Sequence, residues 1–146
     1  MLFKILQTAL PLIWFGMVGA ISFMEAPLKF RAPGLTRAVG LSIGKIVFRG
    51  LNRAEIVLAF LMVVSLFFER PAGNLALYLF GAVLFLLFVQ TFWLLPQLNA
   101  RAERIIGGED APPSRVHLIY VVLETAKFAL LLILGVVLLK NNLRYE

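Results

Sequence analysis

The sequence predicts an all-α integral membrane protein, a bundle of four transmembrane helices. Hydrophobic residues make up 61% of the 146 residues, and the mean hydropathy is +0.92. Charged residues make up only 15% and are clustered between apolar runs that approach the roughly 20 residues needed to cross a bilayer. A soluble fold could not bury so much apolar surface, so we expect lipid to be the solvent.

The first predicted span runs from about Ile5 to Met24, with a kink expected at Pro11. A cleavable signal peptide is the alternative interpretation, because Lys4 precedes an apolar stretch that contains the small pair Gly19-Ala20. The apolar run is long for a signal peptide, which favours a retained span.

The other three predicted spans follow from apolar runs with polar ends. They are about Leu51 to Phe68, Leu75 to about Leu95, where Pro96 is expected to end the helix, and Leu118 to Leu139. We therefore expect a single membrane domain over residues 1–146.

The distribution of basic residues predicts the orientation. Nine of them lie in the connections after the first and third spans: Lys29, Arg31, Arg37, Lys45, Arg49, Arg53, Arg101, Arg104 and Arg115. Four lie on the other side: Lys4, Arg70, Lys140 and Arg144. The positive-inside rule then predicts that both termini lie outside the cytoplasm. The membrane is expected to be a bacterial cytoplasmic membrane. The net charge of +6 is explained by topology, so no nucleic-acid partner is expected.

A shift of 69 positions aligns the sequence with itself at informative residues. Ser22 aligns with Thr91, Phe23 with Phe92, Pro27 with Pro96 and Glu55 with Glu124, without a gap. This offset predicts two tandem two-helix hairpins, about residues 1–70 and 71–146, in the same orientation. Chance matching between apolar helices is the alternative.

A polar stripe enters the fourth span. His117, Tyr120, Glu124 and Lys127 are spaced three, four and three residues apart, which puts them on one helical face. At about 1.5 Å per residue from the start of the span, Glu124 lies roughly 9 Å and Lys127 roughly 13 Å deep. An unpaired charge there costs about 2.5 to 3.5 kcal/mol, so both residues should face the bundle. Glu55 is the expected partner of Lys127.

Two interpretations of this intramembrane polar cluster stay open. It is either a proton or ion relay through Glu55, Glu124 and Lys127, assisted by Tyr120 and Gln90, or a buried ion pair that clamps the helices. His117 is counted with the cluster, as a polar residue near the interface. It is the only histidine, which disfavours a two-histidine haem site.

Neither a catalytic residue, a metal site nor a cofactor is predicted. With no cysteine and four unpaired methionines, the sequence offers no set of ligands for zinc, iron–sulfur or copper. No phosphate-binding fingerprint or hydrolase elbow occurs either.

The connection after the first span has the pattern of an interfacial amphipathic helix. Its apolar residues fall on one side, and a lipid-facing basic set is expected to contact anionic headgroups: Lys29, Arg31, Arg37, Lys45 and Arg49. Gly40 and Gly44 form a G-x-x-x-G pair that could admit another helix closely.

The first third of the chain resembles small four-helix bacterial membrane proteins of unknown function that are grouped with the copper-resistance D superfamily. The residues that carry the resemblance are Trp14, Gly16, Phe23, Pro27, Phe30, Gly40, Gly44 and Phe48. The resemblance implies the four-helix fold. The superfamily also includes copper-uptake proteins and a haem-pathway oxidase, but both use membrane histidines that this sequence lacks.

The first functional hypothesis is a non-enzymatic small transporter, channel-like protein or accessory subunit. It works through the Glu and Lys cluster, and the protein self-associates or joins a larger membrane complex. The alternative is a haem- or quinone-linked membrane redox enzyme.

Overall fold

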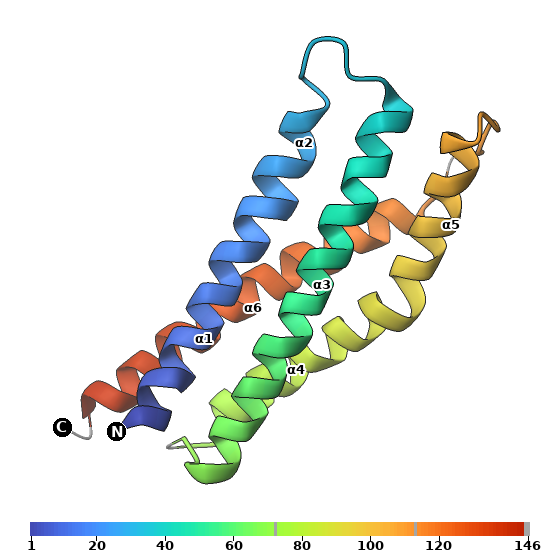
Figure 1. Ribbon diagram of the computed structural model, residues 1–146. Coiled ribbons are helices and arrows are strands. Elements are labelled where there is room, and N and C mark those ends of the chain that lie inside the picture. The colour runs from blue at the N-terminus through green and yellow to red at the C-terminus, as the bar shows by residue number, and fades with distance from the viewer. Residues whose placement is uncertain (72, 113, 145–146) are drawn as a thin grey trace.

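The computed structural model describes residues 1–71, 73–112 and 114–144, and these residues form four long helical rods. The first rod consists of α1 (Leu2–Val18), the π-helix η1 (Gly19–Glu25) and α2 (Ala26–Lys29), and the second is α3 (Arg37–Phe68). The third consists of α4 (Leu75–Val89), the π-helix η2 (Gln90–Leu94) and α5 (Leu95–Ile106), and the fourth is α6 (Val116–Arg144). Both ends of the chain lie at the same end of the bundle, as an even number of crossings requires (Figure 1).

All four rods are long and apolar enough to cross a membrane. The candidate spans are Leu2–Lys29, Arg37–Phe68, Leu75–Ile106 and Val116–Leu143. Large apolar side chains are exposed on their outer faces, for example Phe60, Phe67 and Phe85. Such exposure would be costly in water but suits contact with lipid tails. The predicted four-helix membrane fold is therefore confirmed.

Helix α6 lies at the centre of the packing. Both α1 and α4 pack along it, while α3 packs against α1 and α5. Twelve buried residues form one continuous apolar core: Leu10, Trp14, Val18, Ala59, Met62, Ala76, Phe80, Val83, Leu87, Leu131, Leu134 and Leu138. Gly135 lets α1 come close to α6, because a Cβ atom there would lie 2.5 Å from the Leu12 side chain.

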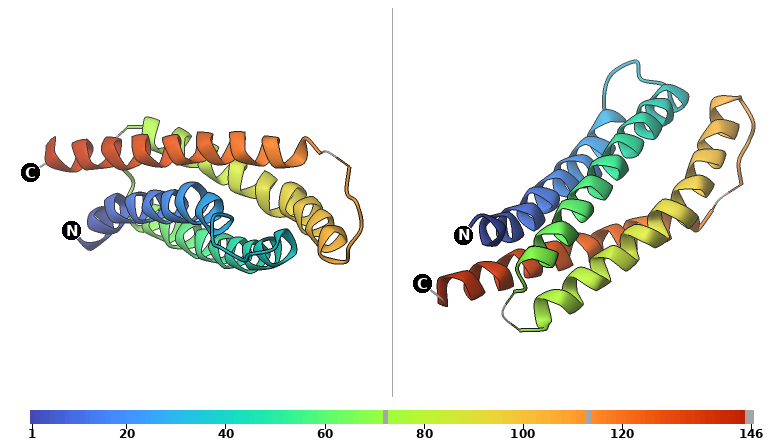
Figure 2. Two further views of the ribbon diagram at one scale, coloured as in Figure 1. Left: turned by 90° about the horizontal axis from the view of Figure 1, so that it is seen from above. Right: turned by 60° about the horizontal axis from the view of Figure 1, so that its bottom comes forward.

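The bundle is tight at the end that holds the termini and spread apart at the other end (Figure 2). At the tight end the Gln7 amide donates to the backbone oxygens of Ser65 and Glu69, at 3.1 and 2.6 Å. The Asn142 amide donates to the Lys4 backbone oxygen and to the Thr8 hydroxyl, at 3.1 and 2.8 Å. These side-chain bonds tie α1 to the ends of α3 and α6.

The predicted ends of the first and third spans are wrong. Helix continues through Pro27 and Pro96 to Lys29 and Ile106, because a π-helical segment precedes each proline. A proline ring clashes with the carbonyl four residues earlier in a regular α-helix, and the wider π turn relieves that clash. Pro11 likewise lies inside α1 without ending it.

The expected amphipathic connection is also largely helical and belongs to the bundle. Residues Arg37, Lys45 and Arg49 lie in the first turns of α3, which runs unbroken into the second span. Thr36 caps this helix, because its hydroxyl accepts from the Val39 N–H at 3.2 Å. Of the five basic residues grouped there, only Arg31 lies in the non-helical connection.

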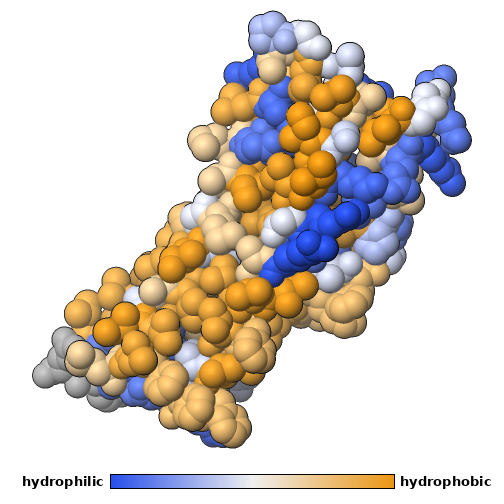
Figure 3. Space-filling model, viewed as in Figure 1, coloured by the Kyte–Doolittle hydropathy of each residue, from blue (hydrophilic) through white to orange (hydrophobic). Residues whose placement is uncertain are grey.

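Polar surface gathers at the spread end. In Figure 3 most of the hydrophilic residues of the visible face lie, among hydrophobic ones, in the part that carries the longer connections, whereas the end with the termini is mainly hydrophobic. The spread end is the one that the basic-residue count predicts to be cytoplasmic.

Candidate functional site

Four charged or amide side chains meet in the interior of the bundle. Glu55 comes from α3, Gln90 from η2, and Glu124 and Lys127 from α6. Each of them is at most 2% exposed. Such burial of ionisable groups is expensive in a membrane unless the groups neutralise one another.

Lys127 is the centre of this buried cluster. Its ammonium group lies 2.9 Å from Oε2 of Glu124, one turn earlier on the same helix, and forms a second ion pair with Glu55 across the bundle. It also donates to Oε1 of Gln90 at 2.7 Å. The three donor positions of the ammonium are thus directed to three different side chains.

The two carboxyl groups have different further partners. Glu55 Oε1 accepts from the indole Nε1 of Trp14 at 2.8 Å. Glu124 accepts from the Ser22 hydroxyl at 2.7 Å and from Gln90 Nε2 at 2.6 Å. Within the part of the chain that the structure describes, no buried side-chain nitrogen or oxygen lacks a hydrogen-bond partner.

The two π-helices help to build this network. Ser22 lies in η1 and Gln90 in η2, and both side chains contact Glu124. The two segments end at Glu25 and Leu94, which are again 69 positions apart. The prediction of two hairpin repeats stays a prediction, because the two π-helices differ in length and begin 71 positions apart.

The charges of the cluster do not balance when all groups are ionised. Glu55 and Glu124 contribute two negative charges against the single positive charge of Lys127. One proton held by the two carboxyl groups would make the cluster neutral. Since a net charge is disfavoured at this depth, the arrangement is suited to binding one proton.

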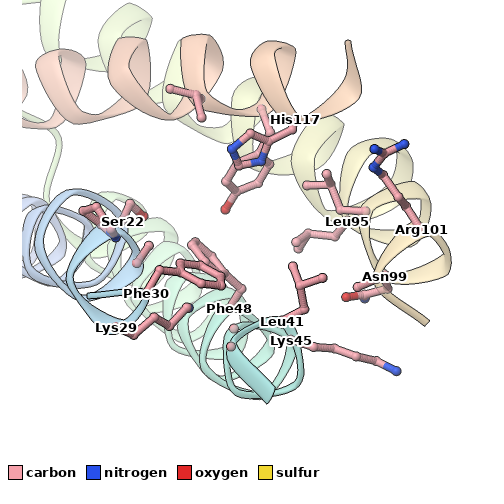
Figure 4. Close-up of a pocket in the computed structure, with 18 of the residues that line it drawn as sticks. Ser22, Lys29, Phe30, Leu41, Lys45, Phe48, Leu95, Asn99, Arg101 and His117 are labelled. Atoms are coloured by element: carbon pink, nitrogen blue, oxygen red, sulfur yellow. The ribbon is translucent and has the colours of Figure 1, made fainter. Parts of the chain in front are cut away.

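A cavity of about 800 Å³ adjoins the cluster and opens at the spread end of the bundle (Figure 4). Its inner end is lined by Ser22, Tyr120 and Glu124. Apolar side chains from α2, α3, α5 and α6 form most of the walls, among them Phe30, Leu41, Phe48, Leu95, Leu98 and Val121. The space exists because the four rods diverge there.

Four cations lie around this cavity. Lys29 faces Glu25 at 3.4 Å and lies over the rings of Phe30 and Phe48, 5.6 and 5.7 Å from their centroids. Lys45 forms an ion pair with Glu103 of α5.

The two arginines of the cavity are bound differently. Arg101 donates to the backbone oxygens of Pro112 and Ala111, and among the residues that the structure describes it forms no ion pair with a carboxylate. Arg37 is exposed, and its side chain has no carboxylate partner among the residues described.

The structure unites most of the predicted cluster but not all of it. Glu55, Gln90, Glu124 and Lys127 meet as expected from their depth, and the expected ion pair of Glu55 with Lys127 forms. Tyr120 is buried beside them and packs its ring edge-on to Phe48, with centroids 5.8 Å apart.

His117 does not belong to the buried cluster. It is exposed and lies at the mouth of the cavity, about 10 Å before Glu124 along α6 at the usual helical rise. The prediction that these residues share one face of α6 agrees with the cavity lining, but His117, the first of them, lies outside the buried part of the bundle.

Trp14 and Ser22 are site residues that the sequence did not reveal. Trp14 is 1% exposed and lies deep in the first rod, where its N–H needs an acceptor. The need for a buried acceptor was the feature of the sequence that could have linked Trp14 to the cluster. Ser22 was noticed only because it aligns with Thr91 at the 69-residue shift. Thr91 makes a different hydrogen bond, since its hydroxyl accepts from Asn52 at 2.8 Å.

Gly40 and Gly44 admit α2 rather than a helix from another molecule. A Cβ atom on Gly40 would lie 2.3 Å from the Phe30 ring, and one on Gly44 would lie 2.9 Å from Nζ of Lys29. The G-x-x-x-G pair therefore serves the hairpin between the first two rods.

The fold and the site together define a multi-pass helical membrane protein with a buried Glu–Lys cluster. A family model described as a domain of unknown function, DUF4149, matches residues 10–105. Since this is more than half of the chain, the protein belongs to that family. The match includes the first three rods but not α6, and it does not establish the predicted link to the copper-resistance D superfamily. Comparisons with curated proteins and with solved structures found no significant match.

Proposed function

We propose that this protein is a small membrane transporter in which a proton is bound and released by the cluster of Glu55, Glu124 and Lys127. The observation that carries the proposal is the position of Glu124. This carboxyl group belongs to the buried cluster and also lines the inner end of a cavity that opens at one end of the bundle.

The composition of the cluster supports proton binding. Two carboxyl groups share one ammonium group, so the cluster gains neutrality when one proton is added. Gln90 links a carboxyl group to the ammonium group, since its nitrogen donates to Glu124 and its oxygen accepts from Lys127. A proton that joins one carboxyl group therefore changes the hydrogen bonds of the whole cluster.

Access from one side only is consistent with transport. The cavity reaches Glu124 from the end predicted to be cytoplasmic, whereas apolar core residues such as Leu10 and Met62 and the bonds of Gln7 close the other end. A transporter needs a second arrangement in which that end opens. The π turns at η1 and η2 adjoin the cluster and are places where helices change direction at low cost.

A structural clamp is the competing explanation of the same ion pairs. A clamp has no need of an opening beside its charges, and a buried ion pair adds little stability relative to apolar residues. The cavity at Glu124 is what favours the relay over the clamp.

Proton flux into liposomes tests the proposal. Purified protein is reconstituted with a pH-sensitive dye inside the vesicles, and a membrane potential is imposed. We expect the wild type to acidify the lumen and Glu124→Gln to abolish the flux, because the glutamine cannot take up a proton. Glu109→Gln, a change at an exposed carboxyl group in the connection after α5, is the matched control and should leave the flux unchanged. Wild-type flux equal to that of protein-free vesicles would refute the proposal.

An absorbance spectrum and a native mass of the gently solubilised protein test the alternatives. A transporter of this kind should be colourless. A haem band or an extracted quinone would instead favour the redox enzyme, and a stoichiometric second subunit would favour the accessory role. The native mass also reports whether the chain self-associates.

A further inference from the structure

We propose that the cavity binds one anionic phospholipid of the surrounding leaflet, with an acyl chain inside and the phosphate group at the basic rim. This inference concerns binding and does not depend on proton movement through the cluster. It rests on three features of the cavity: its apolar walls, its opening toward the lipid, and the uncompensated positive charge at its mouth.

The interior of the cavity suits a hydrocarbon chain. Most of its walls are aliphatic or aromatic side chains, with Phe30 and Phe48 on the α2–α3 side and Leu95 and Leu98 on the third rod. Its volume of about 800 Å³ falls within the range of sites that enclose most of a drug-sized molecule. At its inner end the Ser22 hydroxyl already donates to Glu124, which also accepts from Gln90.

The cavity also reaches the outer apolar surface. Phe23 of η1 and Val121 of α6 both line it, yet they are 41% and 39% exposed. Both rods therefore present exposed apolar side chains at the cavity, which favours an apolar occupant. An occupant from the bilayer can enter between these two rods without crossing water.

The mouth carries the charge that an anionic headgroup requires. Lys29 and Lys45 have acidic partners, Glu25 and Glu103, whereas Arg101 donates to backbone oxygens and has no acidic partner in the described part of the chain. Figure 4 shows Lys45 and Arg101 at the edge of the cavity, with the Lys45 nitrogen turned away from it.

Arginine is well suited to phosphate, because the guanidinium presents paired donors in a planar fork. Arg37 and Arg101 therefore mark the place of the headgroup. A phosphate at this end would lie at the membrane surface that the basic-residue count predicts to be cytoplasmic.

Lipid retention measured by native mass spectrometry tests the inference. Protein is taken from nanodiscs of phosphatidylcholine and phosphatidylglycerol in equal amounts. We expect one retained lipid per chain, with phosphatidylglycerol strongly preferred. The double variant Arg37→Gln/Arg101→Gln should lower that preference roughly 30-fold, from the usual contribution of two basic residues near a membrane surface. Arg70→Gln/Lys140→Gln, at the other end of the bundle, is the control.

A second variant separates the cavity from the general surface. Leu98→Trp fills the cavity but leaves every cation in place, and Leu132→Trp adds the same bulk at an exposed position of α6. We expect Leu98→Trp to lose the retained lipid and Leu132→Trp to keep it. Equal retention of both lipids by the wild type, or an unchanged lipid in a folded Leu98→Trp protein, would overturn the inference.

Discussion

The two halves of the molecule, α1 to α3 and α4 to α6, carry a glutamate at corresponding positions but give it different surroundings. Glu55 accepts from Trp14 and lies in the closed interior. Glu124 accepts from Ser22 and Gln90 and borders the cavity. The position that corresponds to Lys127 in the first half is Leu58, so one lysine serves both carboxyl groups.

This difference shows how two buried glutamates that share one lysine can have different surroundings and different roles. Two identical halves would place equal charges at equal depth with no preferred side. Here the lysine pairs with both carboxyl groups, but the cavity borders Glu124, while the indole of Trp14 donates to Glu55. We infer that Glu124 is the group that exchanges a proton and that Glu55 fixes the position of Lys127.

The largest effect is expected from removing the shared lysine. Lys127→Met should reduce proton flux to the level of protein-free vesicles, while the unfolding midpoint stays near that of the wild type, because both carboxyl groups can then be protonated. Flux and thermal unfolding are measured on the same preparation. Lys140→Met, an exposed lysine near the end of the same helix, is the control.

The same variant distinguishes the clamp from the relay. Under the clamp explanation, breaking the buried pair destabilises the bundle by about 3 to 5 kcal/mol. A loosened bundle would thus favour the clamp. Unchanged flux together with an unchanged midpoint would contradict both explanations.

A chemical comparison of the two glutamates should give the next largest effect. A hydrophobic carbodiimide reaches a buried carboxyl group through an apolar opening, so we expect it to label Glu124, which lines the cavity, several-fold faster than Glu55, which does not. Peptide mass spectrometry at successive times measures both rates. Leu98→Trp should remove the difference by filling the approach to Glu124. Equal rates in the wild type, or faster labelling of Glu55, would contradict the assigned roles.

The sequence predicted the parts of the fold that depend on whether a side chain favours lipid or water. Long apolar runs gave the four spans, and the cost of a charge in lipid brought Glu55, Glu124 and Lys127 together. The end of the third span was not predictable from Pro96, nor was the continuation of the first rod through Pro27. A proline normally ends a helix, and the π turns that accommodate these two depend on tertiary packing.

Other parts of the site depend on contacts that are distant in sequence. Trp14 meets Glu55 across 41 positions, and Ser22 meets Glu124 across 102. The spacing of residues within one helix does not predict contacts between residues so far apart in the sequence. The cavity results from the divergence of four rods, so it could not be inferred from any one of them. His117 was misplaced because helical spacing gives a face but not the depth at which that face becomes buried.

The smallest expected effects come from two glycines of α3, and they distinguish the cavity end from the rest of the helix. Gly40→Ala should cost about 1 kcal/mol, because its Cβ atom would lie 2.3 Å from the Phe30 ring and must displace it. Gly50→Ala meets nothing within 4 Å and should stabilise the helix by up to about 1 kcal/mol. Unfolding of both variants in the same detergent measures the difference. Since Phe30 lines the cavity, Gly40→Ala should also weaken lipid retention, whereas Gly50→Ala should not. A stabilising Gly40→Ala would show that Phe30 yields freely, and the α2–α3 wall of the cavity would then be adaptable rather than fixed.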